Sequence, residues 1–158
     1  MTVRALLRRP VRFSVSAFQL ARRGIWFVTR PVTFGVDAIA LTPEGKVIIV
    51  KLTYASGWHL PGGRRNWHEE PAAAIQRELR EEIGMYGFGS IERIGQFSQR
   101  KHFRHDTVTV FLLRDVRYSP RWSLEIEEVR EFEVDRLPPA AKHARRWVHE
   151  AKRRGLLN

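Results

Sequence analysis

Residues 63–85 read GRRNWHEEPAAAIQRELREEIGM, and this stretch decides the fold. Its second half predicts a helix, because proline suits a first turn, alanine is a strong helix former, and glycine stops a helix. On such a helix Glu78 and Glu82 lie four residues apart and Glu81 lies between them, so three carboxylates crowd one face. Hard divalent cations such as Mg²⁺ require oxygen clusters of this kind. The stretch therefore indicates a cation site.

Arg77 is placed to hold one of the acids in this stretch. It lies four residues before Glu81 and eight after Glu69, so it can pair with either carboxylate. An ordinary solvated Glu/Arg helix is the alternative interpretation. Seven fixed residue identities at average frequencies of roughly 5–8% give about 10⁻⁸ per starting position, which argues against chance.

The stretch resembles the Nudix box, G-x5-E-x7-R-E-U-x-E-E-x-G-U with U aliphatic, and every defined position matches. The resemblance implies a Nudix hydrolase with an α/β/α sandwich fold and a mixed sheet. It also implies hydrolysis of nucleoside diphosphates linked to another moiety, with Mg²⁺ or Mn²⁺ as cofactor. The likeness covers roughly residues 32–138, so a basic N-terminal extension lies outside it.

Metal-binding roles follow from the resemblance, position by position. It implies that Glu78 and Glu82 are the main ligands and that Glu81 is a third ligand or an orienting group. The backbone carbonyl of Gly63 would complete part of the shell. The box is therefore specific for fold and metal chemistry and uninformative about the substrate.

The general base stays open at this stage. Glu78 is one candidate, and an acid from a later loop, Glu125 or Glu128, is another. The resemblance also implies that Glu69 and Arg77 lie behind the ligands, where the arginine fixes a carboxylate's direction. In that position Arg77 belongs to the catalytic machinery.

Two basic segments are candidates for substrate binding. Arg64 and Arg65 could meet phosphates and Trp67 could stack on a base, although a solvated turn with a packed tryptophan explains the same residues. A basic loop over residues 99–106 could bind substrate phosphates, and a solvated hairpin tip is the simpler account. Its candidate substrate-binding residues are Arg100, Lys101, His102 and Arg104.

The rest of the chain predicts one mixed α/β domain over residues 31–158, after a basic arm or helix over residues 1–30. The expected elements are strands over 32–42, 46–53, 91–98 and 107–114, a loop over 57–63, a short strand over 131–134 and a helix after 140.

Composition narrows the class further. The chain has 158 residues, of which 43% are apolar, and no cysteine, so no disulfide framework is possible. No run of 18 apolar residues predicts a spanning helix. Nothing argues for secretion, and we expect a cytoplasmic protein.

The net charge of +11 is concentrated at the two ends. Residues 1–36 hold seven arginines and no acid, and residues 140–158 are also basic, whereas the middle is close to neutral. Contact with RNA or an anionic membrane is therefore expected only at the ends. The arm could equally pack on the domain or on a second copy in a homodimer.

The leading hypothesis is an Mg²⁺-dependent hydrolase of a pyrophosphate bond in a small nucleotide-type substrate. One alternative is a non-catalytic module whose basic ends bind RNA or an anionic membrane. The other is an RNA 5′-end pyrophosphohydrolase, in which the basic ends assist by counterion release.

Overall fold

The computed structural model describes residues 32–101, 104–120 and 123–157. The basic arm of residues 1–30 and His102 therefore lie outside the described residues. The helices are α2 (Pro71–Ile83) and α3 (Lys142–Arg153). The strands are β1 (Val32–Leu41), β2 (Val47–Leu52), β3 (Trp58–His59), β4 (Gly62–Arg64), β5 (Met85–Gly87), β6 (Ser90–Lys101), β7 (Arg104–Arg114), β8 (Arg117–Tyr118) and β9 (Ile126–Phe132).

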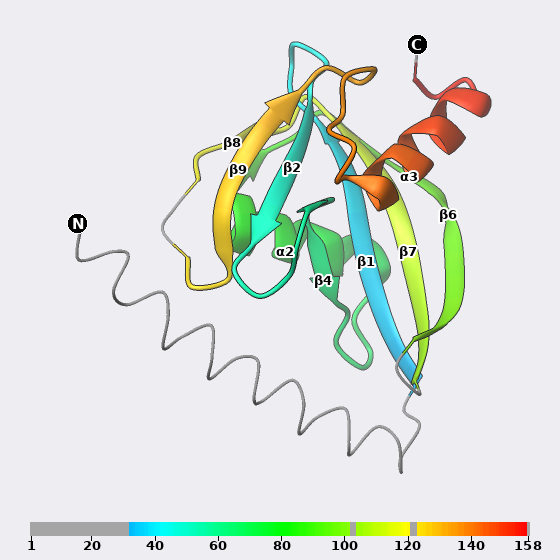
Figure 1. Ribbon diagram of the computed structural model, residues 1–158. Helices are drawn as coiled ribbons and strands as arrows, with labels where there is room; N and C mark the ends of the chain where they lie inside the picture. The colour runs from blue at the N-terminus through cyan, green and yellow to red at the C-terminus, as the bar shows by residue number, and fades with distance from the viewer. Residues whose placement is uncertain (1–31, 102–103, 121–122, 158) are drawn as a thin grey trace.

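Strand β1 is the centre of the main sheet (Figure 1). The strand order is β3-β2-β1-β7-β6, with β4 paired to β1 and β9 paired to β2. Strands β1 and β7 are parallel and the other pairs are antiparallel, so the sheet is mixed. The edge of β1 away from β7 is shared, because Ala40 and Leu41 pair with β2 whereas Gly35–Asp37 pair with β4. This sharing places β4 beside the middle of β1.

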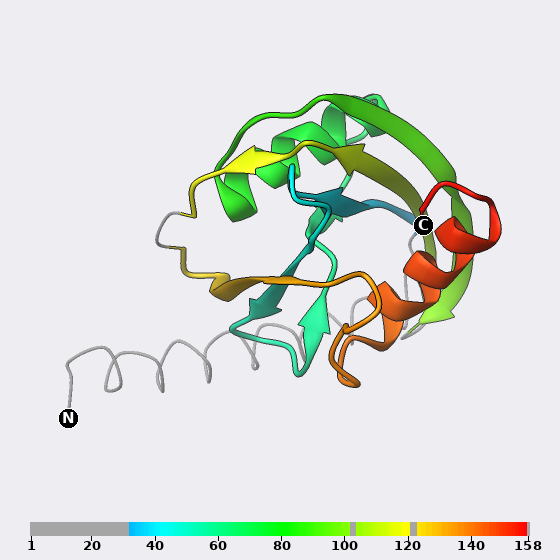
Figure 2. The same cartoon turned by 90° about the horizontal axis from the view of Figure 1, so that it is seen from above.

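Alternate residues of β1 face opposite layers, as the two-residue period of a strand requires. Val36, Ala38 and Ala40 pack in one buried cluster with the apolar face of α2. Ile39 and Leu41 pack in a second cluster with α3. The view from above shows the two helices on opposite sides of the sheet (Figure 2). The expected α/β/α sandwich with a mixed sheet is confirmed.

Helix α2 carries the sequence signals expected of it. Pro71 occupies the first turn, and the helix ends at Gly84, whose φ of 68° is in the left-handed region. A side chain at Gly84 would also collide with the carbonyl of Ser119. Ala74, Ile75, Leu79 and Ile83 are buried on one face, which fixes the rotation of the helix and turns its glutamates toward β4.

Three expectations about the elements were wrong in detail. The loop predicted over residues 57–63 contains β3 and the start of β4, because β3 pairs with β2 and β4 pairs with β1. The short strand predicted over 131–134 is β9, which begins at Ile126 and pairs along most of β2. The basic loop of 99–106 is shorter than predicted, since β6 and β7 pair as far as Lys101 and Arg104.

Membrane insertion finds no support among the described helices, since neither is both long and apolar enough to cross a bilayer.

Candidate active site

Arg77 ties the loop before α2 to the helix. Its Nε and Nη2 donate to the two carboxylate oxygens of Glu69 at 2.9 and 3.0 Å, and its Nη1 donates to Oε1 of Glu78 at 2.8 Å. The same guanidinium donates from Nη2 to the backbone carbonyl of Arg64 at 3.0 Å. The hydrogen bonds from Arg77 lower the pKa of Glu69 to about 2. Arg77 therefore holds the loop, the end of β4 and Glu78 in one arrangement, and its pairing with Glu69 is the one that the spacing predicted.

Two glutamates of α2 lie against the adjacent glycines of β4. The backbone N–H of Gly62 donates to Oε2 of Glu82 at 2.8 Å. A Cβ atom on Gly63 would stand 2.5 Å from Oε2 of Glu78. This approach requires glycine at position 63, and it brings the Gly63 backbone beside the Glu78 carboxylate.

The carboxylates gathered here repel one another. Burial raises the pKa of Glu82 to about 8, the hydrogen bond from Gly62 opposes the rise, and the charges of Glu78, Asp37 and Glu125 add to it. Burial also raises the pKa of Glu78 and is opposed there by Arg77. A group of half-buried acids with few positive neighbours favours any cation that can bind among them.

Asp37 is the member of this group that the sequence analysis missed. It is half-buried in β1, and its register partner on β4 is Gly62. A Cβ atom on Gly62 would stand 3.0 Å from its Oδ1, and burial raises its pKa to about 7. The available signal was a single acid inside the apolar run of residues 36–41. Carboxylates rarely occupy such a strand without a function or a partner.

The structure separates the remaining acidic candidates. Glu81 is exposed on α2, and its Oε2 accepts a hydrogen bond from Nη1 of Arg77 at 3.3 Å. Glu125 is close enough for its charge to raise the pKa of Glu82. Glu128 forms an ion pair with Arg130 instead. Of these two later acids, Glu125 is the one whose charge acts on Glu82.

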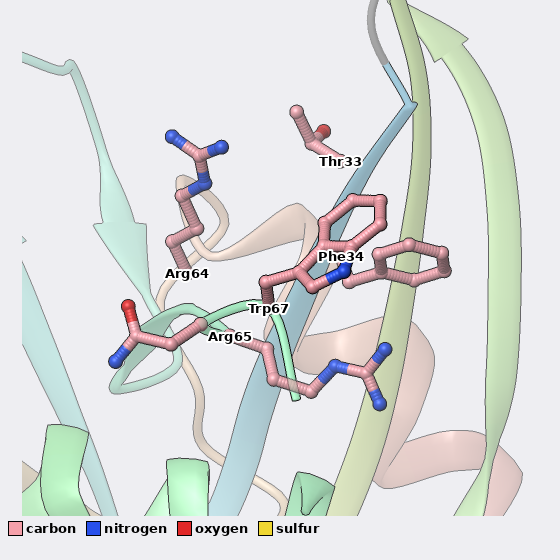
Figure 3. Close-up of a pocket in the computed structure, with 6 residues that line it drawn as sticks. Thr33, Phe34, Arg64, Arg65 and Trp67 are labelled. Atoms are coloured by element: carbon pink, nitrogen blue, oxygen red, sulfur yellow. The ribbon is translucent and has the colours of Figure 1, made fainter. Parts of the chain in front are cut away.

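Of the candidate substrate arginines, Arg64 ends β4 and Arg65 follows it. Arg64 and Arg65 line a hollow of about 150 Å³ next to the start of β1 (Figure 3). Of the second basic segment, the backbones of Arg100, Lys101 and Arg104 lie in the β6–β7 hairpin. The side chains of these three residues, like His102, lie outside what the structure describes.

The donor set fits a hard divalent cation. Glu78, Glu82 and Asp37 offer carboxylate oxygens, and the backbone of Gly63 lies against the Glu78 carboxylate. Within residues 32–101, 104–120 and 123–157, no three Asp, Glu or His side chains are close enough together to hold one ion. The bond from Arg77 uses Oε1 of Glu78 and the bond from the Gly62 amide uses Oε2 of Glu82, so these two bonds leave the second oxygen of each carboxylate for a cation.

Comparison with known proteins agrees with this geometry. The family model of the NUDIX domain matches residues 31–151. An RNA pyrophosphohydrolase of Acidiphilium cryptum is 32% identical over 115 residues, which cover 72% of this chain and 58% of the relative. The chain therefore matches little more than half of that relative's length.

Solved structures share the fold. A crystal structure of a MutT NUDIX hydrolase from Burkholderia pseudomallei matches 75% of this chain and 96% of its own, with a TM-score of 0.65 and 26% identity. A MutT protein from Methanosarcina mazei matches 80% of this chain and 96% of its own, with a TM-score of 0.69 and 20% identity. The second likeness concerns the fold alone.

Proposed function

This chain belongs to the Nudix hydrolase family, and we propose on that premise that it hydrolyses a phosphoanhydride bond with Mg²⁺ or Mn²⁺ as cofactor. The proposed substrate is a nucleoside diphosphate linked to another moiety. One observation carries the proposal: Glu78, Glu82 and Asp37 each lie against Gly62 or Gly63, and burial raises the pKa of all three. Such a cluster is costly unless a cation is bound in it.

The chain's own residues divide the work. Glu78, Glu82 and the Gly63 carbonyl would hold the cation, with Asp37 beside them. When bound, the cation supplies neutralisation of phosphate charge and a lowered pKa for a coordinated water. Arg77 fixes the direction of the Glu78 carboxylate through its 2.8 Å hydrogen bond. The bond between Glu81 and Arg77 supports an orienting role for Glu81.

Glu125 is the favoured base among the later acids. Its charge acts on Glu82, whereas Glu128 is paired with Arg130. The backbone of Glu125 is fixed, because its carbonyl accepts from the amide of Thr53 at 2.9 Å. A general base must reach the attacking water, and the effect of Glu125 on Glu82 supports this role for Glu125.

The 5′ end of RNA is the second candidate substrate. The named relative from Acidiphilium cryptum is an RNA pyrophosphohydrolase. In this chain the outward face of α3 exposes Lys142, Arg145 and Arg146, which form a basic strip. A strip of this kind favours contact with the phosphates of a longer strand and would make binding salt-dependent.

A screen that separates the products by chromatography tests the proposed function, because cleavage inside a nucleotide sugar or dinucleotide yields two phosphate monoesters and no free phosphate. It compares nucleoside di- and triphosphates, nucleotide sugars, dinucleotides and a 5′-triphosphorylated oligoribonucleotide, each with Mg²⁺, with Mn²⁺ and with EDTA. We expect cation-dependent cleavage of at least one substrate. Cleavage that is equally fast in EDTA, or no cleavage of any substrate, would contradict the proposal. If high salt slows the cleavage of the oligonucleotide but not of the small substrates, RNA is the substrate that uses the basic strip.

A further inference from the structure

A hollow of about 150 Å³ lies between the start of β1 and the segment that runs from the end of β4 to Trp67. It is lined by Thr33, Phe34, Arg64, Arg65, Asn66 and Trp67. A cavity of about 150 Å³ is large enough to hold a benzene molecule, so a phosphate group fits in the hollow. Trp67, which is exposed, offers a surface for a base attached to that phosphate.

Arg65 brings an uncompensated positive charge to this hollow. Its guanidinium lies over the ring of Phe34, with 4.7 Å between the guanidinium carbon and the ring centroid. Its buried Nε–H has no hydrogen-bond partner, and no carboxylate of the described residues forms an ion pair with it. An unsatisfied buried donor is unfavourable for the fold alone. The contact with Phe34 holds the guanidinium in place and leaves its charge available to an external anion.

Trp67 supplies a flat apolar surface beside that charge. Its side chain is among the most exposed large apolar groups, with 75% of its surface accessible. In Figure 3 the indole extends over β1 on the same side as Phe34 and Arg65, whereas Arg64 extends away from them. An exposed indole next to a guanidinium is the arrangement that stacks a base while its phosphate is bound.

Other lining groups are already engaged or point elsewhere. The hydroxyl of Thr33 donates to the carboxylate of Asp106 on β7. The backbone carbonyl of Arg64 accepts from Arg77. Arg65 and Trp67 are therefore the two groups that a ligand in the hollow would meet first.

The chain runs directly from the carboxylate cluster to the hollow. Gly63 contacts Glu78, and Arg65 follows two residues later, which is about 7 Å along an extended chain. The amide of Arg65 donates to the carbonyl of Phe34 at 2.9 Å, so its position is fixed against β1. A substrate cleaved at the cluster would reach the hollow with its adjoining nucleotide.

We propose that the hollow is a subsite for a nucleoside monophosphate unit of the substrate, whose phosphate pairs with Arg65 and whose base stacks on Trp67. The proposal rests on the proposed function, because it assigns this unit to the molecule cleaved at the carboxylate cluster. A small nucleotide and the first residue of a triphosphorylated RNA offer the same unit, and the substrates below distinguish them.

Binding of AMP to the full chain in EDTA tests the subsite without turnover. Adenosine and inorganic phosphate are titrated in parallel, and affinity is measured by calorimetry. We expect AMP to bind more tightly than either part, and Trp67→Ala and Arg65→Gln each to weaken AMP at least about fivefold, since stacking on an aromatic side chain contributes about 1–3 kcal/mol per base. Because Trp67 is exposed, its variant keeps the fold even if Arg65→Gln does not.

Matched controls are available on the same protein. Tyr86 is 72% exposed on β5, and Arg80 is exposed on α2, and neither lines the hollow. Tyr86→Ala and Arg80→Gln should leave the AMP affinity unchanged. Equal losses in control and test variants, or AMP binding that is indifferent to both Trp67→Ala and Arg65→Gln, would overturn the subsite.

Turnover separates this proposal from the proposed function. Trp67→Ala should raise KM at least about fivefold with little change in kcat. The rise should occur with whichever substrate binds in the hollow, a small nucleotide or a triphosphorylated oligonucleotide. If AMP binding depends on Trp67 but nothing is hydrolysed, the subsite stands and the hydrolase proposal fails. If Mg²⁺-dependent hydrolysis is seen with KM and AMP affinity unchanged in both variants, the subsite fails alone.

Discussion

The backbone N–H of Gly62 donates a 2.8 Å hydrogen bond to Oε2 of Glu82, a carboxyl whose pKa is raised to about 8. The hydrogen bond stabilises the ionised form, while burial and three neighbouring acids disfavour it. With a pKa of about 8, the Glu82 carboxyl is mostly protonated at neutral pH in the cation-free protein. A divalent cation would displace the proton, so cation binding and proton release are coupled at this residue.

Glu82→Gln should abolish turnover and preserve the fold. The amide oxygen of glutamine can still accept from Gly62, and the variant removes a buried charge. Changing a residue behind the metal ligands typically costs about 10–100-fold, so loss of a ligand should cost about 100-fold or more in kcat. The rate of nucleotide product formation measures the turnover, and thermal melting measures the fold. Glu92→Gln on the exposed side of β6 is the control, and rates within twofold of wild type would reject Glu82 as a ligand.

Without a cation, the stability of the protein should fall as pH rises from about 5 to about 9. Glu82 and Asp37 have pKa values of about 8 and about 7 in the folded chain, above their ordinary values near 4. The folded state therefore binds more protons than the unfolded state in this window, and raising the pH removes the advantage. Glu69 and Glu150, with lowered pKa values of about 2, stay ionised throughout and do not contribute to the slope.

Melting temperatures in EDTA across this pH range measure the effect. The decline should be shallower in Glu82→Gln, and Mg²⁺ should raise the melting temperature most at the alkaline end, where the carboxylates are free of protons. A decline of equal slope in wild type and Glu82→Gln would show that other groups set the pH dependence.

Much of this fold could be predicted from local patterns. The box fixed the limits of α2 because proline and glycine act locally at helix ends, and Arg77 reached Glu69 as the spacing indicated. The strand over residues 126–132 was placed too late because its partner is β2, about 80 positions earlier, and pairing at that distance leaves no local signal.

In the site, too, local relationships were predictable from the sequence and long-range ones were not. The helix glutamates were predictable because one helical period relates them. Asp37 could not be joined to them from sequence, because it reaches Glu82 only through the pairing of β1 with β4. Glu125 and Glu128 were equivalent in the sequence, and only the position of the loop before β9 separates them.

Gly63→Ala should damage the site and spare the fold. The added Cβ would stand 2.5 Å from Oε2 of Glu78, and the flexible end of that side chain can swing away. We expect a loss of about 10–100-fold in cation affinity or kcat/KM, of the size seen when the support of a ligand is changed. Titration with Mn²⁺ and a melting curve measure the two effects. Gly87→Ala is the control, because nothing lies within 4 Å of its added atom.

Arg77→Lys should separate the charge of Arg77 from its geometry. Lysine keeps the positive charge beside Glu78, but it cannot reproduce the paired donors that hold both oxygens of Glu69 at 2.9 and 3.0 Å. The Arg64 carbonyl also loses its 3.0 Å bond, so the end of β4 is released from α2.

The expected result for Arg77→Lys is a loss of about 10–100-fold in kcat/KM, as for other residues that orient metal ligands. The pKa of Glu69, now held at about 2 by Arg77, should rise toward its ordinary value, which a pH titration by NMR can follow. Arg80→Lys, on an arginine that bonds only to Gln76 within the described chain, should be neutral. Full activity together with an unchanged Glu69 pKa in Arg77→Lys would mean that charge alone suffices, and that the fork of hydrogen bonds does not position Glu78.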